Sequence, residues 1–409
     1  MTNNTLFERC SVNTNKESDV FVGIQKVGDI YQINFPLGFH VSDTEKLLRK
    51  DILLLLNVLE QNIDRRESTV SVGAVGENKE TVPVYAYLYL IKDFYERGYY
   101  KEKETFYGNA KRGKINWSRT IKNHKPIIQE NKPYYLDFTV KKSTVNENEL
   151  ITLIHKFCVY ESFEKLGWLF TSFLPRKPKV GLTTKMMLEV VNKKIQNTFN
   201  DRNRQLFYRM KDVLRSIGED ARTEFRYGTS HFEYVWEKMI DKAFGIHGKE
   251  IYFPKTQWDL KDGKTYKNAS LEPDSIMQLN GKIYVLDAKY YKYGQTGIAS
   301  HLPESTSINK QITYGEYIAE ADKFIKNGDH PIVYNAFIMP FDANGKVFPS
   351  DAPIRYIGTA RSDWKRGNNK YENIIGVLMD VKYLMKLDQR LGRSEMIRLA
   401  ELIEENCSA

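Results

Sequence analysis

The stretch LEPDSIMQLNGKIYVLDAKYYKYG, residues 271–294, decides the fold of the C-terminal half of the chain. Asn280-Gly281 stands between two runs rich in β-branched and aromatic residues, a pattern that predicts a tight β-hairpin. Counted outward from this turn, Asp274 lies six residues before Asn280 and Asp287 lies six residues after Gly281. We therefore expect the two carboxylates to be neighbours across the hairpin ladder.

Side-chain alternation decides which groups join the two acids. Asp287 and Lys289 are two residues apart on one strand and face the same way, whereas the Ala288 side chain faces the opposite side. Two like charges this close repel each other, and a hard divalent cation such as Mg²⁺, which prefers oxygen ligands, is the simplest compensation. The sequence therefore predicts two acids and one lysine around a single point.

Two acids and a lysine suit the hydrolysis of a phosphodiester. The metal ion would polarise the phosphoryl oxygen and lower the pKa of a bound water. The Lys289 ammonium would hold that water or stabilise charge in the transition state. A lysine beside two carboxylates keeps its proton unless it is deeply buried, so we expect electrostatic help from Lys289, and the identity of the base stays open.

Two neighbouring helices offer further candidates. In HFEYVWEKMIDKAFG, residues 231–245, Glu233 and Glu237 lie four residues apart on one helix face. Either glutamate could complete a metal site, and both could equally form the wet face of an amphipathic helix. The helix after the hairpin carries Gln311, Tyr314 and Tyr317, which could line the cleft and contact a phosphate or base.

Together these residues resemble a known family. Pro273-Asp274 followed by Asp287-Ala288-Lys289 is similar to the PD-(D/E)XK nuclease signature, and the element order matches that superfamily over about 225–340. A further resemblance is to the McrC-like nuclease subunits of GTP-dependent restriction systems, particularly the LlaJI group. It rests on the two tyrosines that end DAKYY, residues 287–291, and on the helix with Trp236-Glu237. The resemblance implies a role in cutting foreign DNA alongside an McrB-like AAA+ GTPase.

The resemblance also implies roles for individual residues. It makes Asp274, Asp287 and the backbone carbonyl of Ala288 ligands of Mg²⁺, with Mn²⁺ as a possible substitute. It makes Lys289 the catalytic lysine and Glu237, before Glu233, the helix acid. Gln311 departs from the family pattern, because tyrosines follow it at three and six residues rather than four. Double-stranded DNA would be cut to a 5′-phosphate and a 3′-hydroxyl, and a homodimer would allow both strands to be cut.

The order of predicted elements indicates an α/β (α+β) protein with helices on the faces of a mixed sheet. In the first half we expect two strands within 20–36. We also expect three helices there: one capped by Ser42 or Asp43 that runs to about 63, one over 83–98 and one over 148–170. In the second half the patterns predict helices over 184–217, 229–243, 308–326 and 382–405, and strands over 250–253, 274–279, 282–289, 331–338, 353–358 and 374–380.

The sequence LPRKPKVGLTT, residues 174–184, reads as an exposed connection because it holds two prolines, a glycine and three basic residues. We place a domain boundary there. Residues 1–175 would form an N-terminal domain for DNA recognition or partner binding. Residues 176–409 would form the nuclease domain, with its core at about 225–340.

The charge balance favours polyanionic partners. The net charge is +9, and residues 101–143 hold eleven Lys or Arg against four Asp or Glu, interleaved with aromatic residues. The candidate DNA contacts are Lys111, Arg112, Lys114, Trp117, Arg119 and Lys122. The same residues could instead form a solvated basic face, or a surface for the GTPase partner.

Other classes of protein lack support in the sequence. Three scattered cysteines cannot build a disulfide framework or a Cys-type zinc site. GNAKRGKI, residues 108–115, imitates a phosphate loop, but Ile115 replaces the hydroxyl residue that would bind Mg²⁺. The chain has neither a signal-peptide pattern nor an apolar run long enough to span a membrane, so we expect a cytoplasmic protein without membrane contact. The alternative to a nuclease is a nucleic-acid-binding module whose acids and lysine form a structural salt-bridge cluster.

Overall fold

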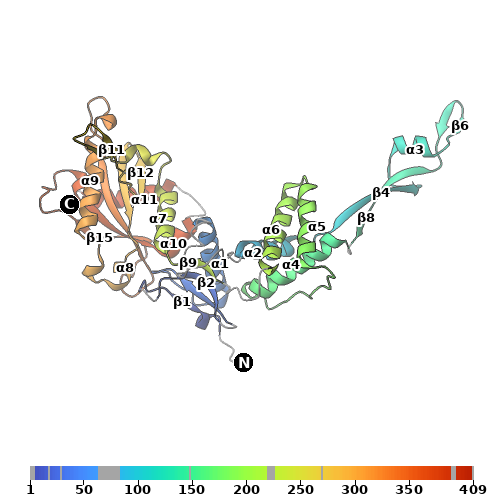
Figure 1. The fold of residues 1–409 in the computed structure, drawn as a ribbon, viewed down its shortest axis with the longest axis horizontal. Coiled ribbons are helices and arrows are strands. Elements are labelled where there is room, and N and C mark those ends of the chain that lie inside the picture. The colour runs from blue at the N-terminus through green and yellow to red at the C-terminus, as the bar shows by residue number, and fades with distance from the viewer. Residues whose placement is uncertain are drawn as a thin grey trace. The chain divides into compact units, whose positions relative to one another are not determined.

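The chain divides into two compact units that are not the two predicted domains. The computed structural model describes residues 5–16, 19–27, 30–62, 83–146, 149–218, 226–268, 270–387 and 393–407. One unit, here called the hairpin unit, combines residues 1–81 with residues 224–409, and the other, the arm unit, comprises residues 82–223. Both contain helices and strands (Figure 1), which confirms the predicted α/β class.

A five-stranded mixed sheet forms the centre of the hairpin unit. In spatial order its strands are β12 (Ser275–Leu279), β13 (Lys282–Ala288), β14 (Val333–Phe341), β16 (Ile374–Asp380) and β15 (Ile354–Ala360). The three central strands are parallel and the two edge strands antiparallel. Asn280 and Gly281 both have positive φ, at 51° and 77°, as a two-residue hairpin turn of this type requires. The predicted hairpin is confirmed.

Helices cover both faces of this sheet. On one face, α9 (Ser305–Glu320) packs Tyr314 and Ile318 against Val285 in a shared hydrophobic core. On the other face, α11 (Arg393–Cys407) is tied to β13, because the Tyr284 hydroxyl donates to Glu404. Since side chains alternate along a strand, Asp287 faces the same side as Val285, toward α9.

Two more helices complete the packing around the sheet. The helix α7 (Phe232–Phe244) packs along β12 and β13, and the indole N–H of Trp236 donates to the carbonyl of Ile338 at 3.3 Å. The helix α10 (Val381–Leu387) follows β16 directly. The single helix predicted over 382–405 is therefore two helices, and residues 388–392 between them lie outside the described part of the chain.

A second sheet joins the beginning of the chain to its C-terminal half. Its order is β1 (Cys10–Val12), β3 (Ile30–Phe35), β2 (Val22–Val27) and β9 (Arg226–Thr229). Gly23 pairs with Gly228, and a Cβ on Gly23 would lie 2.2 Å from the Tyr227 carbonyl oxygen, so the close approach requires glycine. All residues of the arm unit lie between these two paired strands in the sequence.

The helix α1 (Glu45–Asn62) strengthens the same connection. The Lys382 ammonium lies 2.7 Å from the buried Asp51 carboxylate and donates to the Ser42 hydroxyl at 2.8 Å. The N-terminal segment thus belongs to the hairpin unit. A boundary near residue 175 could not capture this arrangement, because the strand and ion-pair partners of the segment are about 200 or more residues away.

Four helices form the body of the arm unit: α2 (Val84–Arg97), α4 (Leu150–Leu166), α5 (Thr184–Gln196) and α6 (Asp201–Gly218). The predicted boundary sequence at 174–184 connects α4 to α5 inside this unit. The predicted helix over 184–217 is two helices. It breaks at Asn197–Asn200, where the Asn200 side chain accepts a hydrogen bond from the N–H of Asn203 and caps α6.

The rest of the arm unit is a long two-stranded ribbon with short elements at one end. β4 (Glu102–Ala110) pairs with β8 (Phe138–Asn146) along its full length. Between these strands come β5 (Lys114–Ile115), α3 (Trp117–Asn123), β6 (Ile127–Gln129) and β7 (Lys132–Tyr134). We call residues 102–146 the arm; it is drawn in cyan in Figure 1.

The remaining elements are short. The strands β10 (Gln257–Asp259) and β11 (Thr265–Lys267) form a separate hairpin, and α8 (Tyr293–Thr296) follows β13. The 3₁₀ turns are Phe7–Arg9, Gly167–Leu169, Lys249–Tyr252, Ala299–His301, Asp322–Phe324 and Lys370–Glu372. The strand predicted over 250–253 is wrong, since Lys249–Tyr252 forms a 3₁₀ turn. Across the described residues, no helix has both the length and the apolar character needed to span a bilayer.

Candidate active site

The hairpin brings three charged groups of the sequence motif together at the carboxyl end of β13. One oxygen of the Asp274 carboxyl accepts a hydrogen bond from the Ala288 N–H at 2.8 Å. The Asp274 and Asp287 carboxyl groups lie within hydrogen-bonding reach of each other. The Lys289 ammonium is 2.7 Å from the second carboxylate, Asp287. All three residues are largely buried, so their charges interact strongly.

Burial sets the protonation of Asp274. Desolvation, followed by repulsion from Asp287 and Glu237, raises the pKa of Asp274 well above its usual range. Two carboxylates this close cannot both carry a full negative charge at low cost, so in the absence of a cation Asp274 retains its proton to higher pH than an ordinary aspartate.

Lys289 keeps its charge in the same surroundings. Burial alone would lower the pKa of an ammonium, but attraction to Asp287 and Asp274 outweighs it, and the pKa of Lys289 is raised. At neutral pH the side chain is therefore a cation.

The structure distinguishes the two glutamates of α7. Glu233 is exposed and bonds to the ring of His231 at 2.9 Å. Glu237 is half-buried and interacts electrostatically with Lys289 and Asp287, and burial raises its pKa. Of the two candidates, Glu237 interacts with the charged groups at the hairpin, whereas Glu233 is paired with His231.

Gln311 lies inside the protein, next to the hairpin but engaged elsewhere. Its side-chain amide is fully buried and donates to the Val285 carbonyl at 2.8 Å, which ties α9 to β13. No contact given by the described residues joins Gln311 to Asp274, Asp287 or Lys289. The prediction that Gln311 lines the cleft gains no support from this position.

Two further residues support the site: Lys249, which the sequence motif did not identify, and Tyr314, which the sequence placed at the cleft. The Lys249 ammonium donates to the backbone carbonyl of Asp274 and lies 2.9 Å from Asp241. The Tyr314 hydroxyl donates to the Glu272 carbonyl at 3.1 Å. Both hold the chain just before Asp274. Lys249 lies in a 3₁₀ turn far from the motif in sequence, so no local pattern could have identified it.

The donor set is tested against Mg²⁺ by its chemistry. The Lys289 N–H donates to the Ile338 carbonyl of β14, whereas the Ala288 N–H donates to Asp274. The carboxyl groups of Asp274 and Asp287 thus lie together at the end of β13, beside the backbone of Ala288. Mg²⁺ is usually bound by one or two carboxylates together with water and substrate phosphate. Over the described residues no group of three or more His, Cys, Asp or Glu side chains forms a ready metal site, and the Mg²⁺ pattern does not require one.

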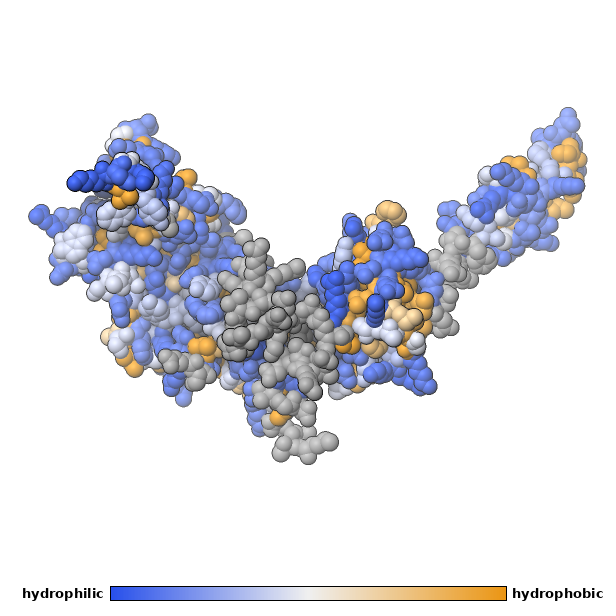
Figure 2. Space-filling view, viewed as in Figure 1, coloured by the Kyte–Doolittle hydropathy of each residue, from blue (hydrophilic) through white to orange (hydrophobic). Residues whose placement is uncertain are grey.

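The basic candidates lie on the arm, outside the hairpin unit. All six of these side chains are exposed: Lys111, Arg112, Lys114, Trp117, Arg119 and Lys122. The Arg119 guanidinium stacks over the Tyr107 ring at 3.8 Å, and the Trp117 ring packs edge-on against Phe138. Exposed apolar residues accompany them, including Ile121, Ile128 and Leu136, and Figure 2 shows hydrophobic residues at the end of the arm.

The sequence that imitates a phosphate loop also lies on the arm. Residues 108–110 end β4, and Lys114–Ile115 form β5, which pairs with β8. A phosphate loop connects a buried strand to a helix, whereas this stretch connects two surface strands. The resemblance to a phosphate loop is accidental, as the sequence indicated.

Comparison with known proteins gives two matches at the level of sequence. The profile of the LlaJI restriction endonuclease family matches residues 21–362. The type II restriction enzyme BsuMI component YdjA of Bacillus subtilis (strain 168) is 29% identical over 270 residues, which are 61% of this chain. The match spans 56% of the length of YdjA.

Two solved structures are distantly similar. A chain in the half-complex of Thermococcus gammatolerans McrB AAA+ hexamers with bound McrC aligns at 15% identity and a TM-score of 0.39, covering 93% of this chain and 83% of that chain. A chain in the T. gammatolerans McrBC complex aligns at 18% identity and a TM-score of 0.19, covering 48% and 58%. With TM-scores this low, neither alignment identifies a shared fold over the whole chain.

Proposed function

The chain belongs to the LlaJI restriction endonuclease family, and from this membership we propose that it is the DNA-cleaving subunit of a restriction system. The observation that carries the proposal is the meeting of Asp274, Asp287 and Lys289 at the end of β13. Two buried acids beside a charged lysine are the arrangement that metal-assisted phosphodiester hydrolysis needs. A structural salt bridge would need only one acid for the lysine.

Lys289, Asp287 and Glu237 have different roles in this proposal. Lys289 remains protonated, so its ammonium stabilises negative charge that develops on the phosphoryl oxygens or orients the attacking water. Asp287 fixes the ammonium at 2.7 Å. Glu237, half-buried beside both, supports the orientation of Lys289 from α7.

We assign the resident cation as Mg²⁺, with Mn²⁺ as a substitute. Asp274, Asp287 and the Ala288 carbonyl would hold it. When bound, the ion polarises the phosphoryl oxygen and lowers the pKa of water. Its charge also removes the repulsion that raises the pKa of Asp274.

We further propose that the chain works with a separate AAA+ GTPase subunit of the McrB type. YdjA is named as one component of a restriction enzyme, which supports a multisubunit assembly. The phosphate-loop-like sequence of this chain connects two strands rather than a strand and a helix, so nucleotide hydrolysis would come from the partner. Two copies of the subunit would cut the two strands of a duplex.

The test compares two double variants that remove the same charges. Asp287→Ala with Lys289→Ala changes the proposed site. Asp262→Ala with Lys264→Ala changes an exposed ion pair of 3.0 Å in the turn between β10 and β11. We expect the first variant to lose DNA cutting by at least about a hundredfold, with DNA affinity unchanged or higher. The second variant should cut like the natural chain.

Cutting is measured with the purified chain, a GTPase partner, GTP, Mg²⁺ and a broad set of DNA substrates. Intact DNA under all these conditions would contradict the nuclease proposal. A site variant that cuts normally but melts at a lower temperature would instead favour a nucleic-acid-binding module with a structural acid cluster.

A further inference from the structure

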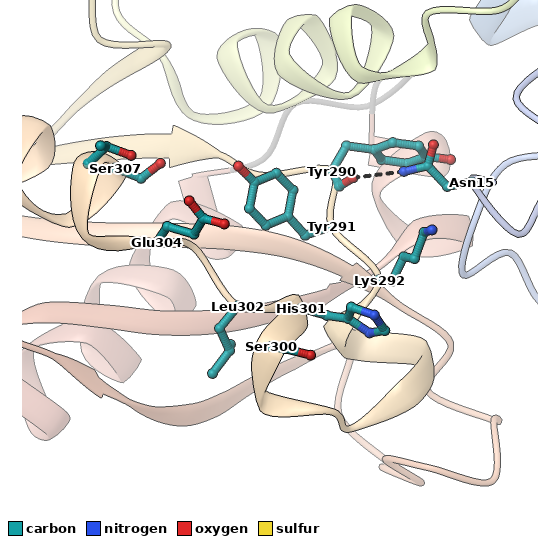
Figure 3. Close-up of a pocket in the computed structure, with 10 residues that line it drawn as sticks. Asn15, Tyr290, Tyr291, Lys292, Ser300, His301, Leu302, Glu304 and Ser307 are labelled. Carbon is teal, nitrogen blue, oxygen red and sulfur yellow. Dashed lines mark hydrogen bonds between the residues drawn. The ribbon is translucent and has the colours of Figure 1, made fainter. Parts of the chain in front are cut away.

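A cavity of about 280 Å³ opens immediately after the catalytic motif. Six of its lining residues carry the argument below: Asn15, Tyr291, Lys292, His301, Glu304 and Ser307. In Figure 3 they come from the segment after β13, from the stretch that leads into α9 and from the N-terminal segment. Tyr291 is two residues beyond Lys289, and the Tyr291 N–H donates to the Lys289 carbonyl at 2.8 Å. The cavity and the acid pair therefore share one short stretch of backbone.

Tight contacts fix the walls of this cavity. The Leu37 N–H donates to the buried Tyr290 hydroxyl at 2.6 Å, which anchors the segment that carries Tyr291. At Gly294 a Cβ would lie 2.1 Å from the Pro340 carbonyl oxygen, so the backbone there packs directly on β14. The His301 ring bonds to the Thr296 hydroxyl at 2.7 Å. A preformed wall of this kind lowers the entropic cost of binding a ligand.

The side chains that line the cavity place a positive charge, an aromatic ring and a negative charge one after another. The Tyr291 side chain is 37% exposed and offers a ring face. In Figure 3 this ring lies between the Lys292 ammonium on one side and the Glu304 carboxylate on the other. Within the described residues neither charge takes part in an ion pair that the structure gives. A cation, an aromatic face and an acceptor in this order match the phosphate, the base plane and the amino group of a nucleotide.

We propose that this cavity binds one nucleotide of the strand being cut, next to the scissile phosphate. Its base stacks on Tyr291, its exocyclic amino group donates to Glu304, and its phosphate contacts Lys292. The cavity volume lies just below the usual range for small-ligand sites, so it has room for no more than one nucleotide. Thymine has no amino group, so the site favours cytosine, adenine or guanine at one position beside the cut. The inference rests on the proposed nuclease function.

The first experiment reads base preference from product ends. Genomic DNA is cut with the complete system, and the ends are sequenced. We expect thymine to be disfavoured about tenfold at one position next to the cut. Glu304→Ala should remove this preference at that position only, and Tyr291→Ala should slow cutting roughly 5- to 100-fold. Lys326→Ala is the control, because Lys326 lines a different cavity near the start of β13.

The second experiment does not depend on cutting. DNA that contains 5-iododeoxycytidine is bound to the chain in Ca²⁺ without Mg²⁺, irradiated and digested, and the cross-linked peptides are identified by mass spectrometry. We expect a cross-link at Tyr291 that persists in Tyr291→Phe and Lys326→Ala. It should disappear in Tyr291→Ala.

The outcomes separate the two proposals. Normal cutting with unchanged ends in Glu304→Ala and Tyr291→Ala would overturn the nucleotide site and leave the nuclease function standing. DNA that is bound but cross-linked only at other tyrosines would overturn it as well. Absence of cutting together with a cross-link at Tyr291 would overturn the nuclease function and leave a nucleotide-binding site.

Discussion

Asp274 and Asp287 are brought together by a two-residue turn, and burial makes their proximity chemically significant. Exposed carboxylates at this separation would be screened by water, whereas here desolvation is the largest cause of the raised pKa of Asp274. The Ala288 N–H stabilises one oxygen of the Asp274 carboxyl and so helps to hold that group beside Asp287. Under the proposed function, this pair would hold the cation.

The raised pKa predicts how pH and metal affect stability. A folded-state pKa above the unfolded value near 3.9 means that the folded protein retains a proton that the unfolded chain releases. In the presence of a chelator, stability should therefore fall as pH rises from about 4 through the folded pKa. Asp274→Asn removes this titration. We expect the natural chain to lose stability relative to Asp274→Asn between pH 5 and 9.

Hydrogen exchange of the β13 amides at several pH values measures this difference within the hairpin unit. Ca²⁺ at pH 8 should slow exchange in the natural chain and have little effect in Asp274→Asn. Identical pH dependence and identical Ca²⁺ response in both proteins would mean that the pair does not form the cation site.

Among the site residues, those on the hairpin could be predicted and those outside it could not. Turn chemistry and strand alternation are local rules, and they correctly placed Asp274, Asp287 and Lys289 together. Helix periodicity put Glu233 and Glu237 on one face but could not choose between them, because the choice depends on how α7 packs against β13. Lys249 depends on tertiary packing alone.

At the scale of elements, the position of the acid pair depends on how closely α9 packs on the sheet. A Cβ on Gly315 would lie 2.6 Å from the Asn335 side-chain nitrogen and 2.6 Å from the Tyr371 Cβ. The Asn335 side chain itself donates to the carbonyls of Gln311 and Tyr371. Because residue 315 is glycine, α9 can pack closely against the buried Asn335 side chain and its hydrogen bonds.

We therefore expect Gly315→Ala to lower the free energy of unfolding of the hairpin unit by about 1–3 kcal/mol, since the added methyl must displace well-packed groups. Thr313→Ala, at an exposed position of the same helix, should change it by less than about 0.5 kcal/mol. Urea unfolding followed by hydrogen exchange in α9 and β14 provides the measurement. Equal stability of both variants would show that α9 has room to shift.

The arm is the element that carries the basic and aromatic candidates. Replacing Lys111, Arg112, Lys114, Arg119 and Lys122 by alanine removes exposed charge from one surface, while the β4–β8 pairing remains. We expect weaker binding of DNA, with a smaller salt dependence, or weaker binding of the GTPase partner. Fluorescence anisotropy and co-sedimentation distinguish the two. Unchanged binding of both would mean that this face is merely solvated.

At the scale of the whole molecule, the sequence predicted most elements and the α/β class but not the division of the chain. Strands and amphipathic helices follow from local periodicity. The pairing of β2 with β9 is non-local, and no feature of residues 22–27 indicates that they pair with residues 226–229. The proline-rich connection at 174–184 looked like a boundary, because a loop between packed helices has the same composition as a linker.

This division predicts how fragments of the protein behave. Residues 82–223 have their own helical core, so they should fold alone and unfold cooperatively. Residues 224–409 lack the partner strand of β9 and the carboxylate partner of Lys382, so they should be poorly protected from protease. Adding residues 1–81 as a separate chain should restore protection. If residues 224–409 alone resist protease as well as the full chain does, the N-terminal segment is dispensable for that unit.

The contact between Tyr290 and Leu37 has a consequence for synthesis. Translation produces the first strands long before the stretch that anchors them, and Lys382, which closes the same arrangement, follows later still. A nascent chain cannot assemble this unit while the ribosome is still working through the middle of the message. A polypeptide interrupted before Lys382 therefore lacks a contact that joins the N-terminal segment to the rest of the hairpin unit.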